Sequence, residues 1–133
     1  PDHHRPRELD IGDQVLRLVG AAMRENVTPG STLARFGGEE FAMLVPGIER
    51  VEAFACAEKI RRNVMARELL KRSTGESLGR VTISLGLAEL RADDTATSLL
   101  ERADACMYRA KQNGRNASVA DWEFDDVAVP NAA

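Results

Sequence analysis

Residues 32–45 read TLARFGGEEFAMLV, two short apolar runs separated by a pair of glycines and a pair of glutamates. A glycine pair between two strand-like runs predicts a tight hairpin, because glycine adopts positive φ angles without steric cost. The second run, residues 41–45, is continuously apolar, which is typical of a strand covered on both faces. This stretch therefore predicts a hairpin whose tip carries two adjacent carboxylates.

Helical periodicity surrounds the hairpin on both sides. Apolar residues recur at spacings of three and four in residues 11–26, 49–70 and 96–112, which predicts three helices. Asn113 and Gly114 are a typical end for the third of them. The charged residues of the second stretch lie mostly off its apolar stripe and are interpreted as a solvated face: Glu58, Arg61, Arg62 and Arg67.

The clearest strand pattern lies in residues 81–88, where larger apolar side chains alternate with small ones. The small residues, Gly86 among them, would let a helix pack closely against that face. Residues 71–79 are polar and predict a loop, and residues 117–120 predict a weak last strand. The order helix, hairpin, helix, strand, helix, strand predicts an α/β fold with helices packed on a mostly antiparallel central sheet.

The length of 133 residues allows one domain, and the net charge is −3. We expect an irregular N-terminus over residues 1–10, the domain over residues 11–120 and an acidic tail over residues 121–133. A mildly acidic chain is a poor candidate for binding nucleic acid polymers. No apolar run approaches the roughly 20 residues that span a bilayer, and no secretory signal is visible, so we expect no membrane contact and a cytoplasmic location.

The cysteines and histidines carry little signal. Cys56 and Cys106 are too far apart in sequence for a CxxC redox or zinc pattern, and they are interpreted as small buried hydrophobes in a reducing compartment. His3 and His4 lack the further ligands that a metal site needs and are interpreted as solvated.

The hairpin tip could carry chemistry. Glu39 and Glu40 are adjacent carboxylates of the kind that hold Mg²⁺ together with phosphate oxygens. Gly37 and Gly38 expose backbone amides and leave room for a phosphate or a base to approach. Metal-assisted phosphoryl transfer would suit this tip. The alternative is an ordinary solvated acidic turn.

A second candidate lies at the end of the third predicted helix. Lys111 and Arg115 are four residues apart and could bind an anion together, with the guanidinium offering a two-pronged contact. The alternative is that both cations only complement the helix dipole and cap its last carbonyls.

Residues 35–41, RFGGEEF, resemble the signature of the GGDEF family, the diguanylate cyclases, in its GGEEF form. Residues 12–19, 81–86 and 103–116 resemble further family segments in family order, so the resemblance covers roughly residues 10–118. It implies a nucleotidyl-cyclase-like α/β sandwich.

The resemblance also implies an activity. A diguanylate cyclase condenses two GTP into cyclic di-GMP and two pyrophosphates. The reaction is a Mg²⁺-dependent (or Mn²⁺-dependent) attack of each 3′-hydroxyl on the α-phosphate of the other GTP, within a homodimer. An upstream sensory or regulatory domain is implied as well.

Roles follow from the resemblance at each matching position. Two carboxylates would bind metal, Glu39 and Glu40, and Glu40 would also be the catalytic residue that helps activate the hydroxyl. The substrate-binding residues would be Gly37 and Gly38 against the nucleotide, Asp13 at the guanine edge, and Lys111 with Arg115 at the β- and γ-phosphates.

Three departures from the family pattern concern this site. The first family strand, with its metal-binding Asp and the guanine-reading Asn after it, has no counterpart here, so we expect that strand to be missing or truncated. The product-inhibition motif is matched by Thr28 and Ser31, and a secondary arginine by Lys59. None of these residues offers the contacts required, which predicts no inhibitory site.

The missing first strand, with its metal-binding Asp and guanine-reading Asn, leaves an alternative function open. The chain would then be a catalytically inactive or truncated module that binds GTP or a partner protein.

Overall fold

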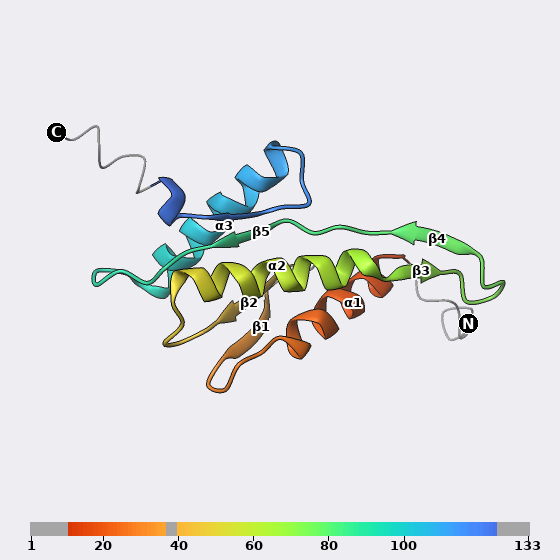
Figure 1. The fold of residues 1–133 in the computed structure, drawn as a ribbon, viewed down its shortest axis with the longest axis horizontal. Coiled ribbons are helices and arrows are strands. Elements are labelled where there is room, and N and C mark those ends of the chain that lie inside the picture. The colour runs from red at the N-terminus through yellow and green to blue at the C-terminus, as the bar shows by residue number, and fades with distance from the viewer. Residues whose placement is uncertain (1–10, 37–39, 125–133) are drawn as a thin grey trace, which may run out of the picture.

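The computed structural model describes residues 11–36 and 40–124. The expectations for residues 1–10, with His3 and His4, and for residues 125–133 lie outside them. The described elements, drawn in Figure 1, are α1 (Ile11–Glu25), β1 (Thr32–Phe36), β2 (Glu40–Leu44), α2 (Arg50–Ala66), β3 (Glu68–Leu70), β4 (Ser77–Arg80), β5 (Leu85–Leu87), α3 (Ala96–Gln112) and β6 (Ser118–Ala120). All three predicted helices are confirmed, and the chain is of the α/β class.

The described strands pair two by two. β1 and β2 form the predicted antiparallel hairpin, and β3 and β4 form a second antiparallel pair. β5 and β6 run parallel, because α3 connects them as a crossover. The mostly antiparallel character is confirmed, although these strands form three two-stranded sheets and not one continuous sheet.

The helices lie on opposite sides of β5. The main core consists of Ala22 and Met23 from α1 with Ile60 and Val64 from α2, all at most 8% exposed. Apolar side chains of the hairpin and of the segment around β5 pack against it. On the other side, α3 contacts β5 and β6, as Figure 1 shows. Apolar burial on both sides of β5 is the main source of stability in such an arrangement.

The close packing predicted for the small-residue face of residues 81–88 is confirmed at Gly86. A Cβ atom added there would overlap the carbonyl oxygen of Ala103 and the backbone nitrogen of Met107, both in α3. Only a residue without a side chain lets the α3 backbone approach β5 this closely. α3 itself begins at a capping box, in which Thr95 and Ser98 exchange side-chain to backbone hydrogen bonds.

The segment after α2 differs from the sequence prediction. The helix ends at Ala66 and not near residue 70, and residues 71–79, predicted as a loop, include part of the β3–β4 hairpin. Leu69 is buried at 6% exposure, and the Arg80 guanidinium donates to the Ala66 carbonyl at the end of the helix. Helical periodicity continues past Ala66 in sequence, but burial of Leu69 and strand pairing with β4 favour the extended form.

Residues 81–88 pair only in part. The ladder with β6 covers Leu85–Leu87, which is shorter than the predicted strand. Val81 and Ile83 nevertheless pack on the main core, as their alternation predicts. The apolar pattern therefore reports which side chains are inward, while the hydrogen-bonded length depends on the neighbouring strand.

Asp121, the first residue of the predicted acidic tail, is buried against the folded body. It is 7% exposed, and its Oδ2 accepts from Arg102 Nε at 3.2 Å. Arg102 also donates from Nη1 to Asp94 Oδ1 and from Nη2 to Asp94 Oδ2, each at 2.8 Å. A buried carboxylate requires a paired cation, and Arg102 supplies it from a distant part of the sequence.

Both cysteines are free thiols. Cys106 is buried as predicted, whereas Cys56 is half-buried and its Sγ lies 3.6 Å from the Asn26 carbonyl oxygen. Burial raises the pKa of both thiols, which disfavours the reactive thiolate. These residues therefore fit the structural role that the sequence indicated.

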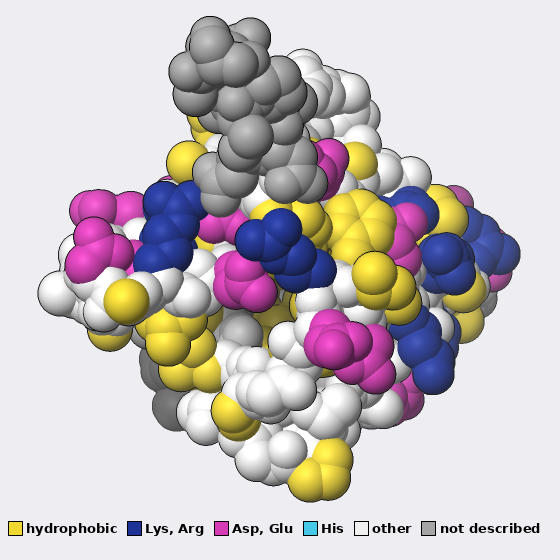
Figure 2. Space-filling model, turned by 60° about the vertical axis from the view of Figure 1, so that its left-hand side comes forward, with side chains coloured by type: hydrophobic (Ala, Val, Ile, Leu, Met, Phe, Trp, Pro, Cys, Tyr) yellow, Lys and Arg dark blue, Asp and Glu magenta, His cyan; other side chains and the backbone are white. Residues whose placement is uncertain are grey.

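The surface carries charges of both signs. Figure 2 shows acidic and basic side chains next to one another on one face, where neither sign forms an extended patch. No helix among the described residues is long and apolar enough to span a membrane.

Candidate functional site

The β1–β2 hairpin flanks the signature residues on both sides. Its strands pair in regular register from Thr32↔Leu44 to Phe36↔Glu40. Glu40 is exposed at the first position of β2. Gly37, Gly38 and Glu39 lie outside the described residues, so their predicted roles stay predictions. The pairing of Phe36 with Glu40 brings together the two residues that flank residues 37–39 in sequence.

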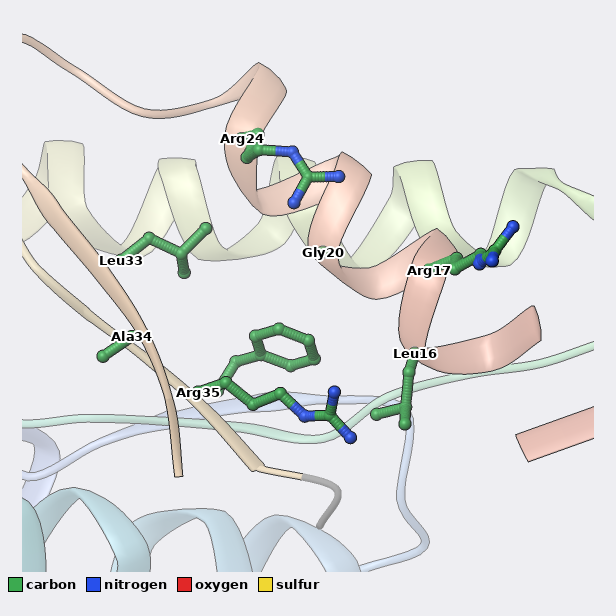
Figure 3. A pocket seen from close by; sticks show the side chains of 8 residues that line it. Leu16, Arg17, Gly20, Arg24, Leu33, Ala34 and Arg35 are labelled. Carbon is green, nitrogen blue, oxygen red and sulfur yellow. The ribbon is translucent and has the colours of Figure 1, made fainter. Parts of the chain in front are cut away.

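A cavity of about 400 Å³ lies between α1 and the hairpin. The helix contributes Leu16, Arg17, Gly20 and Arg24, and the hairpin contributes Leu33, Ala34, Arg35 and Phe41. Figure 3 shows Arg35 extending from β1 into the space between helix and hairpin, whereas Arg17 points away from it. Apolar walls with guanidinium groups at the rim suit a ligand that has both a flat apolar part and negative charge.

Gly20 shapes the helix side of this cavity. A Cβ atom added there would lie 3.3 Å from Arg24 Nη1 and 3.6 Å from the Phe41 ring. The bare backbone therefore leaves room for the ring and for the guanidinium.

The cavity arginines belong to no motif recognised in the sequence. Arg17 and Arg24 are seven residues apart on a predicted helix, a spacing that returns to the same face. Arg35 directly precedes the signature phenylalanine and glycines. The helical spacing of Arg17 and Arg24, together with the place of Arg35 beside the signature, is the signal in the sequence that points to these arginines. The convergence of α1 and β1, however, is a tertiary feature.

The predicted guanine contact, Asp13, falls in the first turn of α1, one turn before the cavity residues Leu16 and Arg17. Its role stays a prediction. The helix that carries it is nevertheless the helix that forms one wall of the cavity.

The basic end of α3 carries the second group of predicted site residues. Lys111 lies exposed in the last turn, and Arg115 lies exposed just after the helix. The helix ends as predicted: the Asn113 N–H donates to the Arg109 carbonyl at 2.9 Å, and Gly114 has a φ of 109°. The Arg115 N–H then donates to the Ala110 carbonyl at 2.8 Å. Backbone amides thus satisfy helix carbonyls, and the cationic ends of both side chains face solvent.

The positions matched to product inhibition form an ordinary turn. Thr28 and Ser31 are hydrogen bonded to each other through their hydroxyls at 2.8 Å. The Ser31 N–H closes the turn on the Thr28 carbonyl at 3.1 Å. Lys59 is exposed on α2. The absence of an inhibitory site stays a prediction.

The described residues can supply part of a magnesium site. They contain no group of three or more carboxylate, histidine or cysteine side chains arranged to hold a metal. Glu40 is a hard oxygen donor in an exposed position. Mg²⁺ is usually held by one or two carboxylates together with substrate phosphates and water, and Glu40 with the adjacent Glu39 fits that donor set.

Two charges of the supposed solvated face of α2 are in fact largely buried. The Glu58 carboxylate accepts from Arg61 Nε at 2.9 Å and from Arg61 Nη2 at 2.7 Å, and the two side chains are 19% and 15% exposed. Arg62, by contrast, is 64% exposed. The hydrogen bonds from Arg61 lower the pKa of Glu58 to about 2, although partial burial opposes the shift.

This pair predicts an acid-dependent loss of stability. Because the pKa of Glu58 is lower in the folded chain, its contribution is complete above an unfolded value of 4.5 and disappears as pH falls toward 2. The pKa shift corresponds to at most roughly 3–4 kcal/mol of stability at neutral pH. We expect Glu58→Gln to lower the melting temperature at pH 7, with the difference from wild type shrinking between pH 4.5 and 2.

Thermal denaturation across that pH range measures the difference. Glu101→Gln, at an exposed position of α3, controls for the general loss of one negative charge. A difference that stays constant with pH would show that the ion pair contributes nothing to the acid dependence.

Comparison with known proteins places these features in a family. The model of the family described as "Diguanylate cyclase, GGDEF domain" matches residues 9–117. The chain is 37% identical over 106 residues to diguanylate cyclase VdcA of Vibrio cholerae, covering 80% of this chain and 31% of the relative. It is 39% identical over 111 residues to response regulator PleD of Caulobacter vibrioides, covering 83% and 24%. The chain therefore spans less than a third of the length of these relatives.

A solved structure agrees with these matches. The GGDEF domain of DgcB from Caulobacter crescentus, in complex with c-di-GMP, is 42% identical to this chain and superimposes with a TM-score of 0.78. The match covers 81% of this chain and 63% of that structure. The α/β sandwich and the family signature thus agree, and this chain belongs to the GGDEF domain family of diguanylate cyclases.

Proposed function

We propose that the protein carrying this domain condenses two GTP into cyclic di-GMP and two pyrophosphates. The observation that carries the proposal is the antiparallel pairing of β1 with β2 on either side of the signature, with Arg35 and Phe41 lining the cavity beside α1, in a chain of this family. Family membership supports the enzyme class, and the hairpin and cavity support a nucleotide site. The proposed domain spans residues 11–120, in a cytoplasmic protein that also contains a sensory or regulatory domain.

The cavity and the basic end of α3 divide the substrate between them. The apolar walls at Leu16, Leu33 and Phe41 suit the base and ribose, with Asp13 one turn away on α1 for the guanine edge. Lys111 and Arg115 would bind the β- and γ-phosphates. Because the net charge is −3, attraction of an anionic substrate depends on these local cations and not on the chain as a whole.

The reaction forms one P–O bond and breaks another at each α-phosphate. The 3′-oxygen of one GTP attacks the α-phosphorus of the other, pyrophosphate leaves with the electron pair of the broken bond, and Glu40 accepts the hydroxyl proton. Glu39 and Glu40 would hold Mg²⁺ or Mn²⁺, which offsets charge on the phosphates when bound. The remaining contribution of the chain is positioning, which is the largest part of catalysis in phosphoryl transfer.

A second copy of the domain follows from this chemistry. Each chain has one signature hairpin, and the product needs two activated α-phosphates facing two 3′-hydroxyls. We propose that two copies meet with their hairpins opposed, which makes turnover depend on dimer formation.

Incubation of the purified protein with GTP and Mg²⁺ tests the proposal. We expect cyclic di-GMP and two pyrophosphates per product molecule, detected by chromatography, with turnover rising with protein concentration below the dimer dissociation constant. Chelation of the metal with EDTA is expected to stop the reaction, and Mn²⁺ is expected to restore it. A folded full-length protein that binds GTP without forming product would contradict the proposed activity and support the binding-module alternative.

A further inference from the structure

The turn that carries Arg115 adopts an unusual backbone conformation. Gly114, Arg115 and Asn116 all have positive φ, at 109°, 64° and 51°. For residues with a Cβ atom this region is unfavourable, and asparagine tolerates it better than arginine does. A run of such residues persists only where surrounding contacts hold it.

Contacts from α2 hold this turn. Asn116 Oδ1 accepts from Arg61 Nη1 at 2.9 Å, across 55 residues of sequence. Asn116 Nδ2 donates to Met65 Sδ at 3.5 Å. Arg61 and Met65 are one helical turn apart on α2, so the asparagine side chain is tied to one face of that helix.

The Arg61 guanidinium is itself fixed. Glu58 takes two of its N–H groups in a bidentate contact, which sets the plane of the guanidinium and leaves Nη1 directed at Asn116. Arg62 approaches the same carboxylate only at 4.0 Å and is mostly exposed. Two neighbouring arginines therefore differ in one relevant respect: Arg61 reaches the turn, and Arg62 lies in solvent beside it.

Asn116 directly follows Arg115 in sequence. The hydrogen bonds that link Glu58 to Arg61 and Arg61 to Asn116 therefore fix the backbone conformation from which the Arg115 side chain projects. We propose that Arg61 is a positioning residue that acts through Asn116 to hold Arg115 in place for binding the triphosphate of the nucleotide. This inference rests on the proposed function, in which Arg115 binds phosphate. Arg61 would thus influence phosphate binding from outside the site, through the turn at residues 114–116.

A purely structural role and a positioning role differ in ligand dependence. A variant that only destabilises the fold would lower the affinity for every ligand by the same factor, or would lower the melting temperature alone. A variant that no longer positions Arg115 would lower the affinity for ligands that carry β- and γ-phosphates and leave the affinity for ligands without them unchanged.

Calorimetric titration of the full-length protein with α,β-methylene GTP and with GMP, in Mg²⁺, separates these cases. Asn116→Gly keeps the left-handed backbone accessible but removes both side-chain hydrogen bonds. We expect this variant to bind the triphosphate analogue about tenfold more weakly, with GMP changed by less than about twofold. Arg61→Lys, which keeps the charge but loses the fork, is expected to behave in the same way. Arg62→Ala is the matched control and should leave both affinities unchanged.

A double-mutant cycle tests whether the effect passes through Arg115. Adding Asn116→Gly to Arg115→Ala should cause no further loss, because the positioned side chain is already absent. Additive losses, equal weakening of both ligands, or an unchanged affinity in Asn116→Gly would each overturn the inference while leaving the proposed function intact. Failure of the wild-type protein to bind the triphosphate analogue would instead overturn the proposed function, and this inference with it.

Discussion

Replacement of Glu40 by alanine is expected to lower the rate of cyclic di-GMP formation by about 10²–10⁴-fold, the range for loss of a positioned proton acceptor. The same change removes one of the two carboxylates proposed to hold the metal, so the loss should lie toward the upper end. The melting temperature should stay within about 3 °C of wild type, because Glu40 is exposed at the edge of the hairpin and outside the core.

Steady-state rates at saturating GTP and Mg²⁺, together with thermal denaturation, measure both effects. Glu101→Ala removes a carboxylate that is also exposed, from α3, and should leave the rate near wild type. Near-normal turnover in Glu40→Ala would remove this residue from the mechanism. A large drop in the melting temperature of Glu40→Ala would mean that its loss of turnover comes from a damaged fold and not from a missing catalytic group.

Replacement of Gly86 by alanine is expected to destabilise the domain by about 3 kcal/mol or more. The added Cβ would overlap the α3 backbone at Ala103 and Met107, and a helix backbone cannot yield as a flexible side chain does. α3 would have to move away from β5, and with it the basic end that carries Lys111. For a domain of this size we expect the melting temperature to fall by more than 10 °C.

Gly20→Ala is the matched control for this prediction. It makes the same chemical change in a buried glycine, but the nearest neighbour at 3.3 Å is the flexible end of Arg24, and the site is helical. Alanine favours a helix by about 1 kcal/mol over glycine, so we expect little change or a small gain in stability. Chemical denaturation of both variants gives the comparison. Similar behaviour of the two would contradict the close-packing explanation for Gly86.

Much of the fold was predictable from local sequence. The hairpin around residues 37–40, all three helices and the inward side chains of residues 81–88 follow from apolar spacing and glycine placement. The end of α2 was predicted wrongly because residues 67–70 continue a helical pattern, whereas pairing with β4, some ten residues later, favours a strand.

The candidate site divides in the same way. The signature and the basic end of α3 are motifs of consecutive residues, and the sequence shows them directly. The cavity arginines were missed, since Arg24 and Arg35 converge only when α1 packs beside β1. Glu58 and Arg61 were interpreted as solvated, because nothing local distinguishes them from Arg62.

The family, the order of elements and the acidic signature between two strands can all be recognised without a structure, because they depend on periodicity and on residues adjacent in the chain. Which charges are buried depends instead on how distant elements pack together. Arg61 meets Asn116 across 55 residues and Arg102 meets Asp121 across 19, and each pair forms where separate elements pack together. The energy of a charge depends on which groups replace its water, and packing alone sets those groups.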